Sequence, residues 1–235
     1  MNTQAIISEL HNDLLKNSDP VRREQAKRFF KEEVNHLGVA VPVVRKISAA
    51  HFSEVKHLDK KEIFQICEKL LKKEQEFQII AFDWLNKIRK KFEPSDFEFF
   101  QYCLENYVSN WASCDDFCAH ALGFFLYKFP QFLPKLKIWA RSENRWMRRA
   151  SAVSLIYSLR KDFYLEDAFE LATILLEDKD DLVQKGYGWM LKEATKTRQK
   201  EVFTFVMNHK AKMPRTALRY SIEKLPSAMK QEAMR

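Results

Sequence analysis

Glycine is scarce in this sequence, with only four residues in 235, at positions 38, 123, 186 and 188. So few glycines exclude GxGxxG and P-loop motifs, whose flexible backbones cradle nucleotide phosphates. The alternating runs of Val, Ile and Thr that mark strands are also missing. The sequence therefore predicts an all-helical protein without a nucleotide-phosphate loop.

Cysteine is equally sparse, and none of the four residues belongs to a CxxC pair. Cys114, Cys118 and His120 are close in sequence, but no fourth ligand follows at a spacing typical of a zinc site. In a reducing compartment we expect the four cysteines to be reduced, buried, small side chains. No metal site and no cofactor is predicted.

Long apolar runs are absent as well. The longest, around Phe117–Tyr127, contains His120 and is shorter than the roughly 20 residues that span a bilayer. Residues 1–15 lack the basic start, apolar core and small-residue cleavage site of a signal peptide. These absences predict a soluble cytoplasmic protein without a membrane partner, which would associate with the nucleoid if it binds DNA.

Basic residues outnumber acidic ones, and the 40 Lys and Arg against 32 Asp and Glu give a net charge of +8. This excess favours a polyanionic partner. With 46% hydrophobic residues, the chain suits a single domain over residues 1–235. The cations that would line a groove for phosphates are Arg22, Arg23, Lys27, Lys31, Arg45, Lys185, Lys192, Lys196, Arg215 and Arg219.

One helix type recurs along the chain. Its anchors, Phe77, Trp111, Trp146 and Leu182, are 34, 35 and 36 residues apart. A period near 35 with two helices per repeat predicts a right-handed α-solenoid of about six HEAT-like antiparallel helix pairs with a concave basic face. Prolines mark the expected helix boundaries, and apolar residues recur at helical spacing, as in residues 63–71.

The repeat breaks its own pattern at Asp115. Four residues after the anchor, the other repeats have the small residues Ala81, Ala150 and Gly186. A carboxylate where close packing favours a small side chain indicates a functional position, although Asp115 or Asp116 could also simply cap a helix or pair with an arginine.

Aromatic and basic residues accompany this carboxylate. Trp111 precedes Asp115 by one helical turn, so both project from the same helix face. Trp189 lies seven residues after the Leu182 anchor, and Arg148 and Arg149 belong to the intervening repeat. We expect the remaining tryptophans, at positions 84, 139 and 146, to lie in the core.

The sequence resembles the bacterial alkylpurine DNA glycosylase D family over nearly the whole chain. Three segments, which include the residues described above, carry the resemblance. They are residues 110–116 (NWASCDD), 144–150 (NRWMRRA) and 183–189 (VQKGYGW) followed by Lys192 and Glu193; residues 37–42 (LGVAVP) resemble the family's N-terminal helix boundary. The resemblance implies HEAT-like repeats, binding of duplex DNA, and excision of alkylated purines. Ala40 departs from it, because better-known members carry a polar side chain there.

The resemblance also implies roles for individual residues. It maps the catalytic aspartate onto Asp115 and its companion tryptophan onto Trp111, with Asp116 leaving the register open by one residue. The later tryptophan maps onto Trp189, the arginine of the intervening repeat onto Arg149, and an aromatic residue at the cleft edge onto Phe29. Arg148, Arg45, Lys185 and Lys192 are expected to contact DNA as well.

The expected chemistry needs no lysine nucleophile. An N3- or N7-alkylated purine is positively charged, so it leaves as a neutral base, while a carboxylate stabilises the positive charge that develops on the sugar. The indoles would bind the cationic lesion through their π faces. The sequence thus predicts a monofunctional DNA glycosylase acting as a monomer on double-stranded DNA.

Three alternatives stay open at this point. The first is a non-catalytic binder of damaged or branched DNA that uses the same basic face. The second is a solenoid scaffold for another protein, because HEAT-like surfaces commonly serve that purpose. The third is a hydrolase using Ser113 or Cys114 with His120, although no nucleophile motif surrounds those residues.

Overall fold

Prolines and capping residues begin many helices in the computed structural model, which describes residues 3–235. Pro20, Pro42 and Pro134 each occupy one of the first two positions of a helix, where a missing N–H removes no helical hydrogen bond. Asp59 and Glu62 form a capping box at the start of another. Residues 3–235 contain no strand, which confirms the all-helical prediction.

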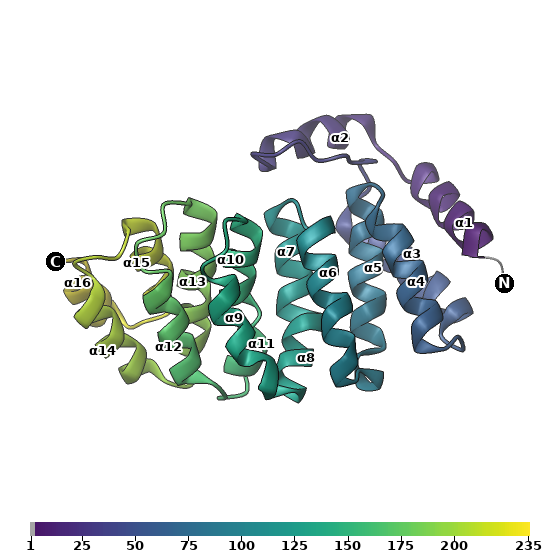
Figure 1. The fold of residues 1–235 in the computed structure, drawn as a ribbon. Coiled ribbons are helices and arrows are strands. Elements are labelled where there is room, and N and C mark those ends of the chain that lie inside the picture. The colour runs from purple at the N-terminus through teal and green to yellow at the C-terminus, as the bar shows by residue number, and fades with distance from the viewer. Residues whose placement is uncertain (1–2) are drawn as a thin grey trace. The chain divides into compact units, whose positions relative to one another are not determined.

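The chain divides into two compact units, Met1–Asp116 and Phe117–Arg235, and each is described by itself. The helices of unit 1, labelled in Figure 1, are α1 Thr3–Lys16, α2 Pro20–Ala26, the 3₁₀ helix η1 Lys27–Phe29, α3 Val41–Val55, α4 Lys60–Leu71, α5 Gln75–Lys87, the 3₁₀ turns η2 Arg89–Lys91 and η3 Pro94–Asp96, α6 Phe97–Tyr107 and α7 Trp111–Asp116.

Unit 2 begins with a π-helical turn. Its helices are η4 Phe117–Leu122, α8 Gly123–Lys128, the 3₁₀ turn η5 Pro130–Phe132, α9 Leu133–Trp139, α10 Arg145–Val153, α11 Ile156–Leu159, α12 Leu165–Ile174, α13 Asp181–Ala194, α14 Gln199–His209, α15 Arg215–Ser221 and α16 Ser227–Met234.

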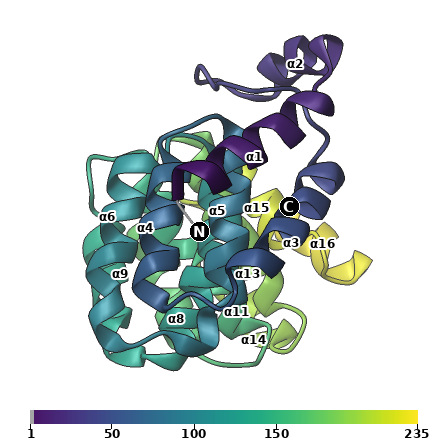
Figure 2. The same cartoon turned by 90° about the vertical axis from the view of Figure 1, so that its right-hand side faces the viewer.

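Helices of unit 1 pack in two rows. In one row α1 contacts α3, α3 contacts α5 and α5 contacts α7, while α4 and α6 contact each other in the second row (Figures 1 and 2). Only three residues join α4 to α5, so this pair folds back on itself. Ile63, Ile66, Cys67, Leu70 and Leu71 of α4 are all buried, as their helical spacing predicts.

Unit 2 repeats this arrangement. There α10 contacts α13 and α13 contacts α15, while α12 packs against α9, α10 and α13. The four predicted anchors therefore lie on helices of one kind, α5 and α7 in unit 1 and α10 and α13 in unit 2. Stacked helix pairs are confirmed within each unit, and a single domain over residues 1–235 stays a prediction.

The cores contain the expected aromatic side chains. Trp84, Trp139 and Trp146 are 0%, 3% and 7% exposed, which confirms their prediction as core residues. All four cysteines are buried and form no disulfide. Among residues 3–235, none of the helices has the length and hydrophobicity that a membrane span requires.

Candidate functional site

A buried polar network fixes the start of α7, the helix that carries Trp111 and Asp115. Asn110, 1% exposed, accepts a hydrogen bond from the backbone N–H of Ser113 at 2.9 Å through Oδ1 and donates to Gln75 Oε1 at 2.8 Å through Nδ2. Because these polar atoms are buried and satisfied by one another, the helix start is well defined. Trp111 and the partly buried Asp115 then lie one helical turn apart, as predicted.

The segment around Phe29 holds the Trp111 indole. Trp111 Nε1 donates a hydrogen bond to the Phe29 carbonyl oxygen at 3.2 Å, and the Phe30 ring stacks on the indole with centroids 5.6 Å apart. Phe29 itself, predicted to lie at the edge of a cleft, is 72% exposed. Sequence analysis singled out Phe29 and missed Phe30, because only the fold shows which of two adjacent phenylalanines meets the indole.

Glu76 anchors the chain that follows this segment. Its carboxylate accepts hydrogen bonds from the backbone N–H groups of Leu37, Gly38 and Val39 at 2.9 to 3.1 Å. Burial alone would raise the pKa of Glu76, but His36, whose Nδ1 lies 3.8 Å from the carboxylate, and the hydrogen bonds from these backbone amides outweigh burial and lower it. Gly38 is required here because its φ is +87° and a Cβ would lie 2.3 Å from the Asp19 carbonyl oxygen.

Arg45 on α3 pairs with the carboxylate next to Asp115. Its Nη2 lies 2.6 and 2.7 Å from the two carboxylate oxygens of Asp116, and its Nη1 donates to the Ile79 carbonyl oxygen at 3.2 Å. Arg45 Nη1 is also 3.7 Å from an Asp83 oxygen. The side chain of Arg45, which was predicted to contact DNA, thus connects α3 to α5 and α7 within unit 1.

Arg149 in unit 2 is buried, with 5% of its surface exposed. Its Nη1 donates a hydrogen bond to the Leu182 carbonyl oxygen in the first turn of α13. A Cβ at Gly186 would lie 3.1 Å from Arg149 Cγ, so the small residue allows this arginine to pass along α13. The predicted link between a small residue and close helix packing is therefore seen at this position.

Arg148, next to it, is tied to the loops at both sides of α10. Its Nε donates to Asp178 Oδ2 at 2.7 Å, and its Nη1 donates to the carbonyl oxygens of Ser142 and Glu143 at 2.9 and 3.0 Å. Both arginines predicted in this repeat are thus held by groups of unit 2.

Trp189 lies beside the buried carboxylate of Glu193, which sequence analysis named only as part of a segment that resembles the glycosylase family. Its Nε1 donates to Glu193 Oε1 at 3.2 Å, while Arg160 Nε and Lys196 Nζ each lie 2.7 Å from Glu193 Oε2. Burial alone would raise the pKa of Glu193, but hydrogen bonds from Arg160, Lys196 and Trp189 lower it to about 2. The four-residue spacing of Trp189 and Glu193 was a usable signal, whereas Arg160 comes from a distant segment.

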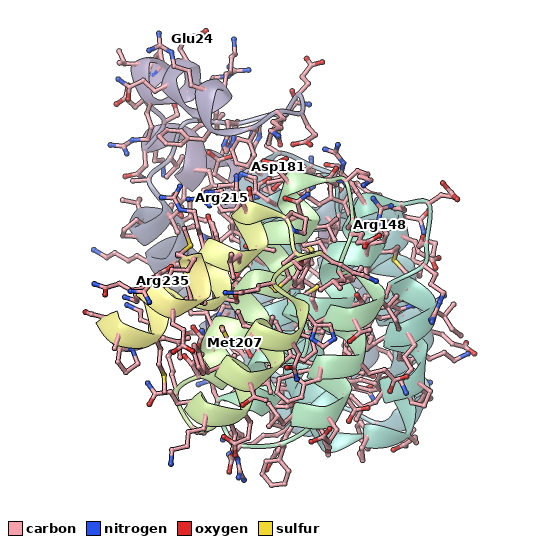
Figure 3. All side chains as sticks on the ribbon, turned by 90° about the vertical axis from the view of Figure 1, so that its left-hand side faces the viewer. Glu24, Arg148, Asp181, Met207, Arg215 and Arg235 are labelled. Atoms are coloured by element: carbon pink, nitrogen blue, oxygen red, sulfur yellow. The ribbon has the colours of Figure 1, made fainter. Side chains whose placement is uncertain are left out.

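The remaining predicted cations differ in their surroundings. Lys185 pairs with Asp181 at 3.1 Å, and Lys192, only 16% exposed, pairs with Glu223 at 3.0 Å. In unit 1, Arg22, Arg23, Lys27 and Lys31 are all exposed on α2 and the segment after it, with Lys27 also pairing with Glu24. Glu24 lies on the outer side of this segment (Figure 3).

Two polar networks therefore hold the predicted aromatic residues. Unit 1 combines Trp111 and Asp115 on one short helix, with the indole held by the Phe29 and Phe30 segment. Unit 2 combines Trp189 with Glu193 on α13, the helix that Arg149 also binds. Each arrangement holds an indole surface in place, which suits recognition of a positively charged group.

Comparison with protein families gives one match that spans most of the chain. A family model described as DNA alkylation repair enzyme matches residues 10–225. A search among curated proteins gave no match.

Three solved structures illustrate the similarity of the fold. A predicted DNA alkylation repair enzyme from Enterococcus faecalis is 19% identical, with a TM-score of 0.80 over 90% of this chain and 98% of that one. AlkD2 from Streptococcus mutans is 15% identical, with a TM-score of 0.65 over 96% and 100%. Alkylpurine DNA glycosylase AlkC from Pseudomonas fluorescens, bound to DNA containing an abasic site analogue, is 15% identical, with a TM-score of 0.56 over 99% and 65%.

Proposed function

Because the chain belongs to the DNA alkylation repair enzyme family, we propose that it is a monofunctional glycosylase that excises positively charged N3- and N7-alkylated purines from double-stranded DNA. Its fold is that of AlkD2 and of AlkC, and the AlkC structure contains DNA with an abasic site analogue. An abasic site is the product that a glycosylase leaves. We further propose that the protein acts as a cytoplasmic monomer bound to the nucleoid.

The reaction replaces the bond between the sugar and the base by a bond to water. As the glycosidic bond breaks, its electron pair moves to the purine and neutralises the positive charge, so no general acid has to protonate the leaving base. The sugar becomes oxocarbenium-like, a water oxygen bonds to C1′, and the released proton passes to a carboxylate or to solvent. The reaction needs neither a cofactor nor a lysine nucleophile.

Asp115 is the carboxylate that we assign to this step. The observation that carries the assignment is the ion pair between Asp116 and Arg45, because it gives the Asp116 carboxylate a structural role in linking α3 to α7. Asp115 lies one turn after Trp111 on a helix whose start is fixed by Asn110. A negative charge about 4 Å from the sugar cation contributes about 4 kcal/mol at an effective dielectric constant of 20.

Trp111 and Trp189 are proposed to bind the cationic lesion. Indole π faces attract cations by about 0.5 to 2 kcal/mol, depending on how far water is excluded. Phe30 stacks on the Trp111 ring and Glu193 accepts a hydrogen bond from Trp189, so each indole keeps a fixed orientation. Preorganised groups of this kind lose little entropy when the substrate binds.

Phosphate binding is proposed for two kinds of cation. The exposed residues Arg22, Arg23, Lys27 and Lys31 would contact phosphates directly, with Phe29 packing on the DNA nearby. The paired cations Arg45, Arg148, Lys185 and Lys192 would contact DNA while keeping or exchanging a carboxylate partner. Arg149 is buried, and we assign to it the positioning of α13, which carries Trp189.

Release of free base from methylated duplex DNA tests this function. We expect the wild-type protein to release 7-methylguanine and 3-methyladenine without cutting the strand. Salt-sensitive DNA binding without base release would favour the non-catalytic binder, and salt-independent or absent binding would favour a protein scaffold.

A further inference from the structure

Helices α1 and α3 of unit 1 pack against each other (Figure 2). Titratable side chains of these two helices form a cluster. Glu9 on α1, and His51 and Glu54 on α3, each offer one possible ligand atom, and these atoms all lie within 4.8 Å of one another. His51 and Glu54 are three residues apart, so they project from the same side of α3. The cluster plays no part in the glycosylase chemistry proposed above.

His51 supplies the buried member of this cluster. It is 6% exposed, and its Nε2 lies 3.0 Å from Asp13 Oδ2. The other carboxylate oxygen of Asp13 accepts a hydrogen bond from Lys16 Nζ at 2.9 Å. Because a carboxylate accepts hydrogen bonds, the contact between His51 and Asp13 fits the tautomer with the proton on Nε2, which leaves Nδ1 available as a ligand atom.

The Nδ1 atom of His51 is buried and has no hydrogen-bond partner among residues 3–235. It faces the carboxylate of Glu54, whose Oε2 is 3.8 Å away, too far for a hydrogen bond. A buried polar atom without a partner is uncommon and costs free energy. A buried nitrogen without a partner therefore lies next to a carboxylate, which is an arrangement that a cation would satisfy.

We propose that Glu9, His51 and Glu54 bind one divalent transition-metal ion, with Zn²⁺ as the best match. Zinc binds both imidazole nitrogen and carboxylate oxygen, and in sites with three protein ligands a water occupies the fourth position of the tetrahedron. Bond lengths of about 2.0 to 2.2 Å require ligand atoms roughly 3.4 Å apart. The side chains of Glu9 and Glu54 are exposed and have several rotatable bonds, so they can close on the ion.

Asp13 would act as the outer partner of this site. One of its oxygens accepts the His51 Nε2 hydrogen bond, and the other accepts a hydrogen bond from Lys16 at 2.9 Å. A carboxylate behind a metal-binding histidine fixes the tautomer and makes the ring more basic. The ion would join α1 to α3 beyond the contacts that the apolar side chains of α1 already make.

Titration of untagged, chelator-treated protein with Zn²⁺, followed by calorimetry, tests the proposal. We expect one ion per chain, with binding at least about tenfold weaker in Glu9→Gln and Glu54→Gln and about 10- to 100-fold weaker in Asp13→Asn. Glu105→Gln is the matched control, because Glu105 is an exposed glutamate on α6 whose carboxylate accepts a hydrogen bond from Gln101. Circular dichroism of each variant checks that it is folded.

Two further readouts separate this site from other binding. Zn²⁺ should raise the melting temperature of the wild type and of Glu105→Gln, but not that of Glu54→Gln. Co²⁺ in place of Zn²⁺ should give a visible spectrum without thiolate bands, because the four cysteines are not ligands. Absence of saturable Zn²⁺ binding, or equal affinity in the wild type and Glu9→Gln, Glu54→Gln and Asp13→Asn, would overturn the proposal.

Discussion

Both carboxylate oxygens of Asp116 lie within 2.7 Å of the same nitrogen of Arg45, the Nη2 atom. The pair joins α3 to α7, although the 55 residues from 56 to 110 separate these two helices along the chain. The resemblance left the register of the catalytic carboxylate open between Asp115 and Asp116, and this contact gives Asp116 a role in linking two helices. The distinction leads to the first prediction.

Arg45→Met should destabilise the protein by about 1 to 3 kcal/mol, because Asp116 is 14% exposed and would lose its charged partner. Urea unfolding followed by circular dichroism measures the change. Lys16→Met is the control, because the ion pair between Lys16 and Asp13 is largely exposed and should contribute less than about 1 kcal/mol. Equal, small effects in both variants would show that the Arg45 pair has no structural importance.

Glu193 should make stability depend on pH at the acidic end. Its pKa is lowered from 4.5 to about 2, so its contribution is present above pH 4.5 and is lost as the pH falls toward 2. Glu193→Gln should cost about 2 kcal/mol at neutral pH, less than the full shift implies because Arg160 and Lys196 are about half exposed. A wild-type advantage that stays constant from pH 7 to pH 2 would contradict the assignment.

Trp189→Phe should slow the release of 7-methylguanine by about 2- to 30-fold, which corresponds to the 0.5 to 2 kcal/mol of a cation–indole contact. Single-turnover rates on methylated duplex DNA measure this loss. Trp139→Phe provides a control, because Trp139 is 3% exposed in the core and its replacement should affect stability rather than the rate. Unchanged release in Trp189→Phe would remove this indole from the site.

Replacing Arg22 and Arg23 together by Gln should weaken DNA binding and reduce its salt dependence. Each phosphate contact contributes about −0.9 to the slope of log K against log salt, so the slope should fall by about 2. Lys185 and Lys192 have carboxylate partners, and their replacement by Gln should change the slope by less than half as much. Fluorescence anisotropy over a range of salt concentrations distinguishes these outcomes, and the opposite order would assign the phosphate contacts to α13.

Sequence patterns predicted the helices well because those signals are local. Proline positions, the apolar face of residues 63–71 and the four recurring helices all match the structure. The one-turn relation of Trp111 and Asp115 is equally local and is also present. These features need only the geometry of a single helix.

Partners of charged residues could not be predicted in the same way. Arg148 meets Asp178, Arg45 meets Asp116, and His51 meets Asp13, pairs that are 30 to 71 residues apart in sequence. The partner of an arginine or histidine depends on which helices pack together, and the amino-acid composition does not show which helices do. For this reason sequence analysis could not tell which basic residues are held by distant carboxylates, as Arg45 and Arg148 are.

Base release by the wild type and by Asp115→Asn tests the central claim most directly. We predict that the wild type releases 7-methylguanine from methylated duplex DNA and that Asp115→Asn does so about 1000-fold more slowly, since about 4 kcal/mol of charge stabilisation is lost. DNA affinity should stay within about twofold, and Asp116→Asn should keep most of the activity. Equal release by the wild type and Asp115→Asn, or no release by either with DNA binding intact, would contradict the account.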